Sequence, residues 1–210
     1  DAGELTQSIR RVMADAPQRL KGTEGSTERH KPAKTFLFLS TKGGIGKTTL
    51  VTALGVTLAR TGRKTLVIDT AIGSGGVANL LNNSARGRTL VDLFEEPGPW
   101  TRDTVYQYII RHEESGLYYL PTHTDPIWSD QYPVIDPYKQ LLELVRADGF
   151  EYILVDTTSR LNMVNGDLMS LADLVVLMCT QGMMSLNNLT ELYTACIRSG
   201  ELLGFALPRE

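Results

Sequence analysis

The residues that most clearly suit a chemical role lie in one short segment, residues 40–49. It reads Ser-Thr-Lys-Gly-Gly-Ile-Gly-Lys-Thr-Thr. Its glycines let the backbone adopt positive φ angles and approach a ligand closely, so that successive N–H groups can converge on an anion. The Lys47 ammonium suits β- and γ-phosphates, the Thr48 hydroxyl suits Mg²⁺, and Thr49 suits an α-phosphate. The segment therefore predicts a phosphate-binding loop for a nucleotide.

Two aspartates stand at the ends of apolar runs elsewhere in the chain. Asp156 ends the run Tyr-Ile-Leu-Val-Asp, and Asp69 ends the run Thr-Leu-Val-Ile-Asp. A nucleotide site of this kind needs a carboxylate at a strand end to hold the Mg²⁺ shell. We therefore expect Asp156 to hold the metal together with Thr48, with Asp69 at the end of another strand.

The elements that must position these residues follow from short apolar runs that alternate with helical patterns. Strands are expected at 36–40, 65–69, 116–120, 151–156 and 174–179, and helices at 48–61, 136–147 and 185–198. The strands lack polar alternation, which indicates a parallel sheet buried on both faces. The predicted fold is α/β: a mostly parallel, doubly wound sheet flanked by helices, with ligands at the carboxyl ends of the strands.

The first 35 residues differ from the rest of the chain. Residues 1–20 carry apolar side chains at helical spacing, which predicts an amphipathic helix that packs on its own domain or on a partner. Residues 21–35 contain no large apolar side chain and are expected to form a flexible linker. The folded domain is then expected at 36–210, C-terminally incomplete.

Composition excludes several classes of protein. The 210 residues carry 21 basic and 24 acidic side chains, a net charge of −3, which argues against a strongly basic nucleic-acid binder. No run is apolar enough for a membrane span and no signal peptide is seen, so a cytoplasmic protein is expected. Cys179 and Cys196 lie in apolar stretches and are predicted to be buried free thiols.

The phosphate loop departs from the standard pattern in two places, since Thr41 replaces the first glycine and a second lysine, Lys42, precedes the glycine pair. This form resembles the deviant Walker A loop of the MinD/ParA family of P-loop ATPases. The resemblance implies ATP and Mg²⁺ as cofactors and a homodimer formed through the nucleotide face, in which Lys42 reaches the partner's nucleotide. It implies catalytic roles for Lys42, Lys47 and Asp69. The expected nucleotide contacts are Lys42, Gly43, Gly44, Ile45, Gly46, Lys47, Thr48 and Thr49.

One position breaks the resemblance. Family members typically carry Asp-x-Asp where this chain has Asp69-Thr-Ala71, and the second aspartate helps to hold the attacking water. An alanine methyl can neither accept a hydrogen bond nor carry charge. Either the protein is naturally a poor hydrolase, or Ala71 was introduced to trap an ATP-bound state. Both interpretations predict nucleotide binding with slow turnover.

The layout between the motifs most resembles the pilus-assembly branch, the TadZ/CpaE-type proteins, with FlhG and MinD as near alternatives. The function so implied is an ATP-dependent dimerising switch that positions or helps assemble a cellular machine, recruited to a pole or the inner membrane face through a protein partner. The alternative is a non-catalytic nucleotide-binding scaffold, which Ala71 favours. A ParA-like role in DNA partition would need a basic surface, whereas the arginines are scattered along the chain.

The segment after the last expected strand carries three further expectations. Ser185 is predicted to cap the following helix. Met183 and Met184 could form a dimer or partner surface, or pack in the core. Loop 121–137, with Trp128, is either a docking surface or a segment packed on the domain.

Overall fold

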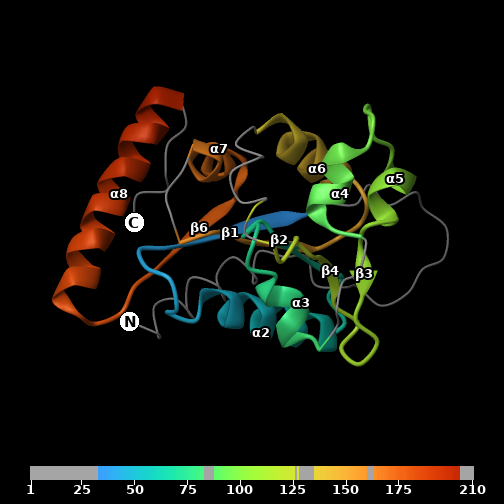
Figure 1. Ribbon diagram of the computed structural model, residues 1–210, viewed down its shortest axis with the longest axis horizontal. Helices are drawn as coiled ribbons and strands as arrows, with labels where there is room; N and C mark the ends of the chain where they lie inside the picture. The colour runs from blue at the N-terminus through green and yellow to red at the C-terminus, as the bar shows by residue number, and fades with distance from the viewer. Residues whose placement is uncertain (1–32, 83–87, 126, 128–134, 160–162, 204–210) are drawn as a thin grey trace, which may run out of the picture.

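A computed structural model describes residues 33–82, 88–125, 127, 135–159 and 163–203 (Figure 1). The strands are β1 (Lys34–Ser40), β2 (Thr65–Asp69), β3 (Ile110–Arg111), β4 (Tyr118–Leu120), β5 (Tyr152–Asp156) and β6 (Leu174–Met178). The helices are α2 (Lys47–Arg60), α3 (Gly76–Leu80), α4 (Leu90–Glu95), α5 (Arg102–Tyr106), α6 (Asp136–Arg146), α7 (Met163–Leu171) and α8 (Met183–Leu203).

The strands form one sheet in the order β3-β4-β2-β5-β1-β6. All neighbouring strands are parallel except β3 and β4, which pair antiparallel. The predicted α/β fold with a mostly parallel sheet is therefore confirmed. The register sets Asp156 of β5 beside Phe38 of β1 and beside Asp69 of β2. The two aspartates expected at strand ends thus meet at one edge of the sheet.

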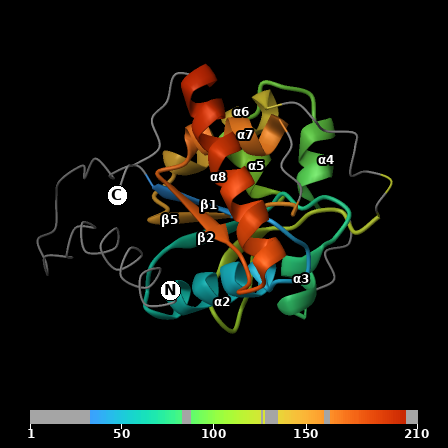
Figure 2. The ribbon, with the colours of Figure 1, turned by 90° about the vertical axis from the view of Figure 1, so that its left-hand side faces the viewer.

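Helices cover both faces of the sheet. In Figure 1, α2 and α3 lie below it and α4 to α7 lie above, while α8 stands at its β6 edge; Figure 2 shows the same edge from the front. Successive residues of a strand point to opposite faces, so a strand between two helical layers must be apolar at every position. Phe36 and Phe38 accordingly pack in the α2 layer, whereas Leu37 and Leu39 pack in the other.

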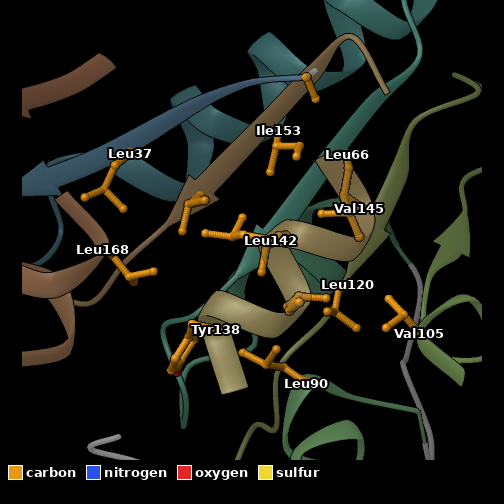
Figure 3. Packing of buried hydrophobic residues seen from close by; sticks show 14 of the residues in the cluster. Leu37, Leu66, Leu90, Val105, Leu120, Tyr138, Leu142, Val145, Ile153 and Leu168 are labelled. Atoms are coloured by element: carbon orange, nitrogen blue, oxygen red, sulfur yellow. The ribbon is translucent and has the colours of Figure 1, made fainter. Parts of the chain in front are cut away.

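The larger core lies between the sheet and α6. Figure 3 shows Leu142 and Val145 of α6 beside Leu66 and Ile153 of the sheet, and all four side chains are buried. This face of α6 is the apolar stripe predicted for a helix at 136–147. The close packing fixes β2 and β5 relative to each other, and these two strands carry Asp69 and Asp156.

Four helices had no counterpart among the predicted elements: α3, α4, α5 and α7. The first three are only one or two turns long, too short for a periodic pattern to mark them. At two of these helices, side chains near the first turn define the N-terminus. Thr89 forms a capping box with Asp92 at α4, and Thr101 forms one with Thr104 at α5.

The first strand begins two residues earlier than the strand predicted at 36–40. Strand β1 begins at Lys34 rather than Phe36, inside the stretch assigned to the linker. Thr35 is buried, and its backbone N–H donates to Asp173 Oδ2 at 2.7 Å. A backbone hydrogen bond thus orders residues that lack large apolar side chains. The helix predicted at 1–20, the rest of the linker and Trp128 lie outside the described residues.

Three expectations around β6 and α8 are corrected. Cys179 is exposed rather than buried, because it directly follows β6, which lies at the edge of the sheet that the described strands form. Ser185 lies inside the first turn of α8 rather than at its cap, and its Oγ accepts a hydrogen bond from the Thr180 N–H at 2.9 Å. Met183 and Met184 are 74% and 78% exposed, so they do not pack in the core. Across the described residues, no helix is long and apolar enough to cross a membrane.

Candidate nucleotide-binding site

The glycine-rich loop joins the end of β1 to the start of α2 at the carboxyl edge of the sheet. Gly44 and Gly46 have φ angles of 76° and 88°, values that favour glycine. Gly46 is the N-cap of α2, and as a glycine it supplies no side-chain cap to the N–H groups of that first turn. A helix start with unsatisfied N–H groups and the positive end of its dipole is suited to an anion.

Lys47 points back from α2 to the end of β5. Its ammonium donates to Asp156 Oδ1 at 2.6 Å and to the Thr157 carbonyl oxygen. Lys47 is 7% exposed and Asp156 is fully buried. Removing the two charges of a buried ion pair from water costs free energy. An anionic ligand can replace the carboxylate as the partner of the lysine ammonium. The lysine is therefore held at the place where a nucleotide's phosphates would meet the carboxylate.

The remaining oxygen of Asp156, Oδ2, is buried and has no hydrogen-bond partner among the described residues. An unpartnered buried carboxylate oxygen fits a cation, and a carboxylate with a hydroxyl is an oxygen donor set of the kind Mg²⁺ takes. The hydroxyl predicted to join it belongs to Thr48, in the first turn of α2. A methyl group added at Gly76 would lie 2.8 Å from Thr48 Cγ2, which places Thr48 against the start of α3.

Asp69 holds the segment that follows β2. Its Oδ1 accepts from the Ala71 N–H at 3.0 Å, and its Oδ2 accepts from the Val77 N–H at 3.2 Å. Burial raises the pKa of Asp69 to about 7, and the nearby Asp156 carboxylate adds to the rise. Both oxygens thus accept backbone hydrogen bonds, and the carboxyl is mostly neutral only below about pH 7.

Ala71 lies where the family's second aspartate was expected. It is 7% exposed, and its carbonyl oxygen accepts a hydrogen bond from the Ser74 hydroxyl at 2.7 Å. The backbone of this turn is well held, but the side chain is a methyl group. The turn therefore contributes no polar side chain at position 71.

The structure brings Lys47, Asp69 and Asp156 together at one edge of the sheet. It leaves the Lys42 side chain exposed. Sequence reasoning missed Thr157, whose carbonyl accepts from Lys47 and whose Oγ1 donates to the Phe38 carbonyl at 2.6 Å. Its position directly after Asp156 was the only available signal. In the described ranges, no cluster of three or more His, Cys, Asp or Glu side chains could hold a metal ion.

Comparisons with known proteins show which proteins this chain is similar to. A protein-family model described as "AAA domain" matches residues 33–199. The chain is 30% identical over 171 residues to an uncharacterized ATP-binding protein of Methanocaldococcus jannaschii, covering 81% of this chain and 62% of that protein. It is 28% identical over 172 residues to the chromosome partitioning protein ParA of Caulobacter vibrioides, covering 77% and 61%.

Among solved structures, the MinC:MinD cell division protein complex of Aquifex aeolicus matches with a TM-score of 0.64 and 25% identity, covering 80% of this chain and 65% of that one. The sheet, the loop at its carboxyl edge and these similarities define a P-loop nucleotide-binding protein. The chain belongs to the AAA domain family and, within it, to the MinD/ParA-type P-loop ATPases. It spans about three fifths of the length of the curated relatives it matches.

Proposed function

We propose that this chain binds ATP with Mg²⁺ at the loop of residues 42–49. The observation that carries the proposal is the buried Lys47 ammonium, which lies 2.6 Å from Asp156 Oδ1. Lys47 is the first residue of α2, and the N-cap residue of that helix, Gly46, supplies no side-chain cap. The choice of ATP is supported by the relative from Methanocaldococcus jannaschii, which is named as an ATP-binding protein. Thr49, in the first turn of α2, would contact the α-phosphate.

Binding redistributes the charges of the site. The phosphates of ATP compete with Asp156 for the Lys47 ammonium, so the lysine turns from the carboxylate toward the nucleotide. Asp156 and Thr48 would then hold Mg²⁺, which supplies positive charge to the β- and γ-phosphate oxygens when bound. The N–H groups of Gly43 to Lys47 would surround the β-phosphate.

Hydrolysis by this chain is proposed to be slow. Phosphoryl transfer requires an oriented water molecule more than a strong base, and a methyl group at position 71 cannot orient one. The oxygens of Asp69 already accept backbone hydrogen bonds, so that residue is a positioning group for the turn. The ATP-bound state is therefore expected to be long-lived.

The biological role that follows is an ATP-dependent switch that positions a cellular machine. Two chains would associate through their nucleotide faces when ATP is bound, and the dimer would recruit a protein partner. The relatives support such a role, since one is named as a chromosome partitioning protein and another was solved in a cell division complex. The pilus-assembly branch and recruitment to a pole or the inner membrane face stay predictions from the motif layout.

A second candidate function is a non-catalytic scaffold that binds nucleotide without using its hydrolysis. The methyl side chain of Ala71 favours it. The two functions differ in what a restored carboxylate would do. A switch should gain turnover from Ala71→Asp, whereas a scaffold that lacks other parts of the machinery should not.

The test combines nucleotide binding with turnover. We expect a fluorescent ATP analogue to bind the parent chain and Ala71→Asp, and Lys47→Ala to lose binding by about 100-fold, because it removes the buried cation of the site. Lys139→Ala removes a lysine on the exposed face of α6 and should bind as the parent does. Normal binding by Lys47→Ala would overturn the assigned site. No gain of phosphate release in Ala71→Asp would favour the scaffold.

A further inference from the structure

We propose that Ser159 positions the attacking water for ATP hydrolysis, in the role that a carboxylate at position 71 would otherwise have. This inference rests on the proposed ATP site. Ser159 lies just beyond the end of β5, and a methyl group added at Gly43 would lie 3.5 Å from its Oγ. The hydroxyl therefore lies against the first glycine of the phosphate loop.

This position is the terminal-phosphate end of the site. In phosphate-binding loops of this type the lysine reaches the β- and γ-phosphates, so Lys47 Nζ marks that end. The Nζ donates to the carbonyl of Thr157, two residues before Ser159 along the chain. The segment after β5 thus begins at the lysine and reaches Gly43 at Ser159, and we place the Ser159 hydroxyl beside the γ-phosphate of a bound nucleotide.

The hydroxyl is also free to act. Ser159 is half-buried, and no hydrogen bond engages its Oγ within the part of the chain that the structure describes. The two carboxylates at this edge have other roles. Both oxygens of Asp69 accept backbone N–H groups, and Asp156 pairs with Lys47 through Oδ1 and would hold Mg²⁺ through Oδ2. Thr122 Oγ1 has no hydrogen bond to the residues that the structure describes, but Thr122 is 2% exposed and closed to water.

A serine hydroxyl can orient water without taking its proton. Its oxygen accepts a hydrogen bond from the water, and its own O–H donates to a γ-phosphate oxygen. The water oxygen forms a bond to the γ-phosphorus, and the bond from phosphorus to the β–γ bridging oxygen breaks. That electron pair leaves with ADP, and the proton lost by the water ends on the released phosphate. Ser159 is unchanged by the reaction.

Orientation by a neutral hydroxyl is weaker than orientation by a carboxylate, since the hydrogen bond is not charge-assisted. The proposal therefore predicts slow but measurable turnover that depends on Ser159. It also predicts that the dependence shrinks once a carboxylate is restored at position 71. This coupling distinguishes a water-positioning residue from one that only supports the loop.

The experiment measures phosphate release and fluorescent-nucleotide binding for the full chain, with and without Ala71→Asp. We expect Ser159→Ala to lower kcat roughly tenfold to a hundredfold with KM and nucleotide Kd unchanged. Ser159→Thr keeps a hydroxyl and should retain most of kcat. In the Ala71→Asp background the loss from Ser159→Ala should be less than about threefold. Ser170→Ala, at an exposed hydroxyl on α7 that donates to the Asp167 carbonyl, is the matched control and should match the parent.

Two results would overturn the proposal while leaving the nucleotide site intact. One is Ser159→Ala turning over like the parent, and the other is a parent that binds ATP but releases phosphate no faster than Lys47→Ala. A loss of nucleotide binding in Ser159→Ala would make the residue structural instead. If the parent itself fails to bind nucleotide, the proposed function falls first, and the binding measurement shows this separately.

Discussion

At the scale of single residues, the properties of the site depend on a small number of ionisable side chains that lie together in a buried region. Among the described residues, Lys47 is the cation that pairs with Asp156, and Asp69 stands in register beside Asp156. Two carboxylates close together in a low-dielectric region disfavour each other's ionisation. Burial raises the pKa of Asp69 to about 7, and the Asp156 carboxylate adds to the rise, because Lys47 pairs directly with Asp156 and only distantly with Asp69.

This shift gives the nucleotide-free protein a particular pH dependence. The folded carboxyl of Asp69 keeps its proton up to about pH 7, while the unfolded one loses it near pH ~4. The contribution of Asp69 to stability is therefore present at low pH and is lost as pH rises through about 7. It falls by up to about 1.4 kcal/mol per pH unit between those limits.

Asp69→Asn removes this contribution, because an amide does not titrate. We expect the free energy of unfolding of the parent to decline relative to that of Asp69→Asn between about pH 5 and about pH 7, and the difference to stay constant above that. Urea denaturation with EDTA present measures it. Parallel curves for the two proteins across this range would contradict the raised pKa.

At the scale of elements, α2 must approach the sheet closely for Lys47 to reach Asp156. Gly55 makes this approach feasible, because a methyl group there would lie 2.8 Å from Val67 Cγ2 and 3.2 Å from Leu117 Cδ1. Glycine is a poor helix former, so Gly55 weakens α2 as a helix but allows it to pack closely on β2. The helix start is then held at the carboxyl edge of the sheet.

Gly55→Ala should destabilise the protein by roughly 1–3 kcal/mol, because overpacking against Val67 and Leu117 outweighs the better helix propensity of alanine. Gly166→Ala in α7 is the matched comparison, since no atom of the described residues lies within 4 Å of a methyl group added there. It should stabilise by up to about 1 kcal/mol. Chemical denaturation of both variants checks the pair. Equal effects of the same sign would show that helix propensity alone decides.

At the scale of the whole molecule, the nucleotide loop and the first turn of α8 are adjacent. Thr41 Oγ1 and Ser185 Oγ lie 3.4 Å apart, which joins the start of the loop to the helix at the β6 edge (Figure 2). The neighbouring Met183 and Met184 are exposed, as is the Lys42 side chain. Met184 and Lys42 each adjoin one of the two residues in this contact, so an exposed apolar pair and an exposed cation lie next to it, which suits association controlled by the bound nucleotide.

Lys42 provides the test of that association. If two chains meet through this face, Lys42→Ala should bind ATP close to normally, because its own site keeps Lys47, and yet fail to dimerise. Light scattering with ATP and with ADP measures the mass. We expect the parent to double its mass with ATP only and Lys42→Ala to stay monomeric under both conditions. Dimerisation of Lys42→Ala with ATP would assign the interface to other residues.

The sequence by itself determined the features that are local in the chain. Residues 40–49 are contiguous, so their glycines, lysine and threonines predict a phosphate loop without knowledge of the fold. The apolar runs at 65–69, 151–156 and 174–179 predicted strands within one residue of their observed bounds. Their lack of alternation predicted a parallel sheet, because burial on both faces leaves its mark on every residue of a strand.

Only the tertiary structure decided which distant residues meet. Lys47 and Asp156 are 109 positions apart, and their ion pair depends on β5 lying beside β1, a strand order that no local pattern encodes. The same order places β6 at the sheet edge, which exposes Cys179 although its run is apolar. Ser159 reaches Gly43 for the same reason. The hydrophobic pattern of a strand indicates whether its faces are buried. Which strands it pairs with depends on the packing of the whole chain.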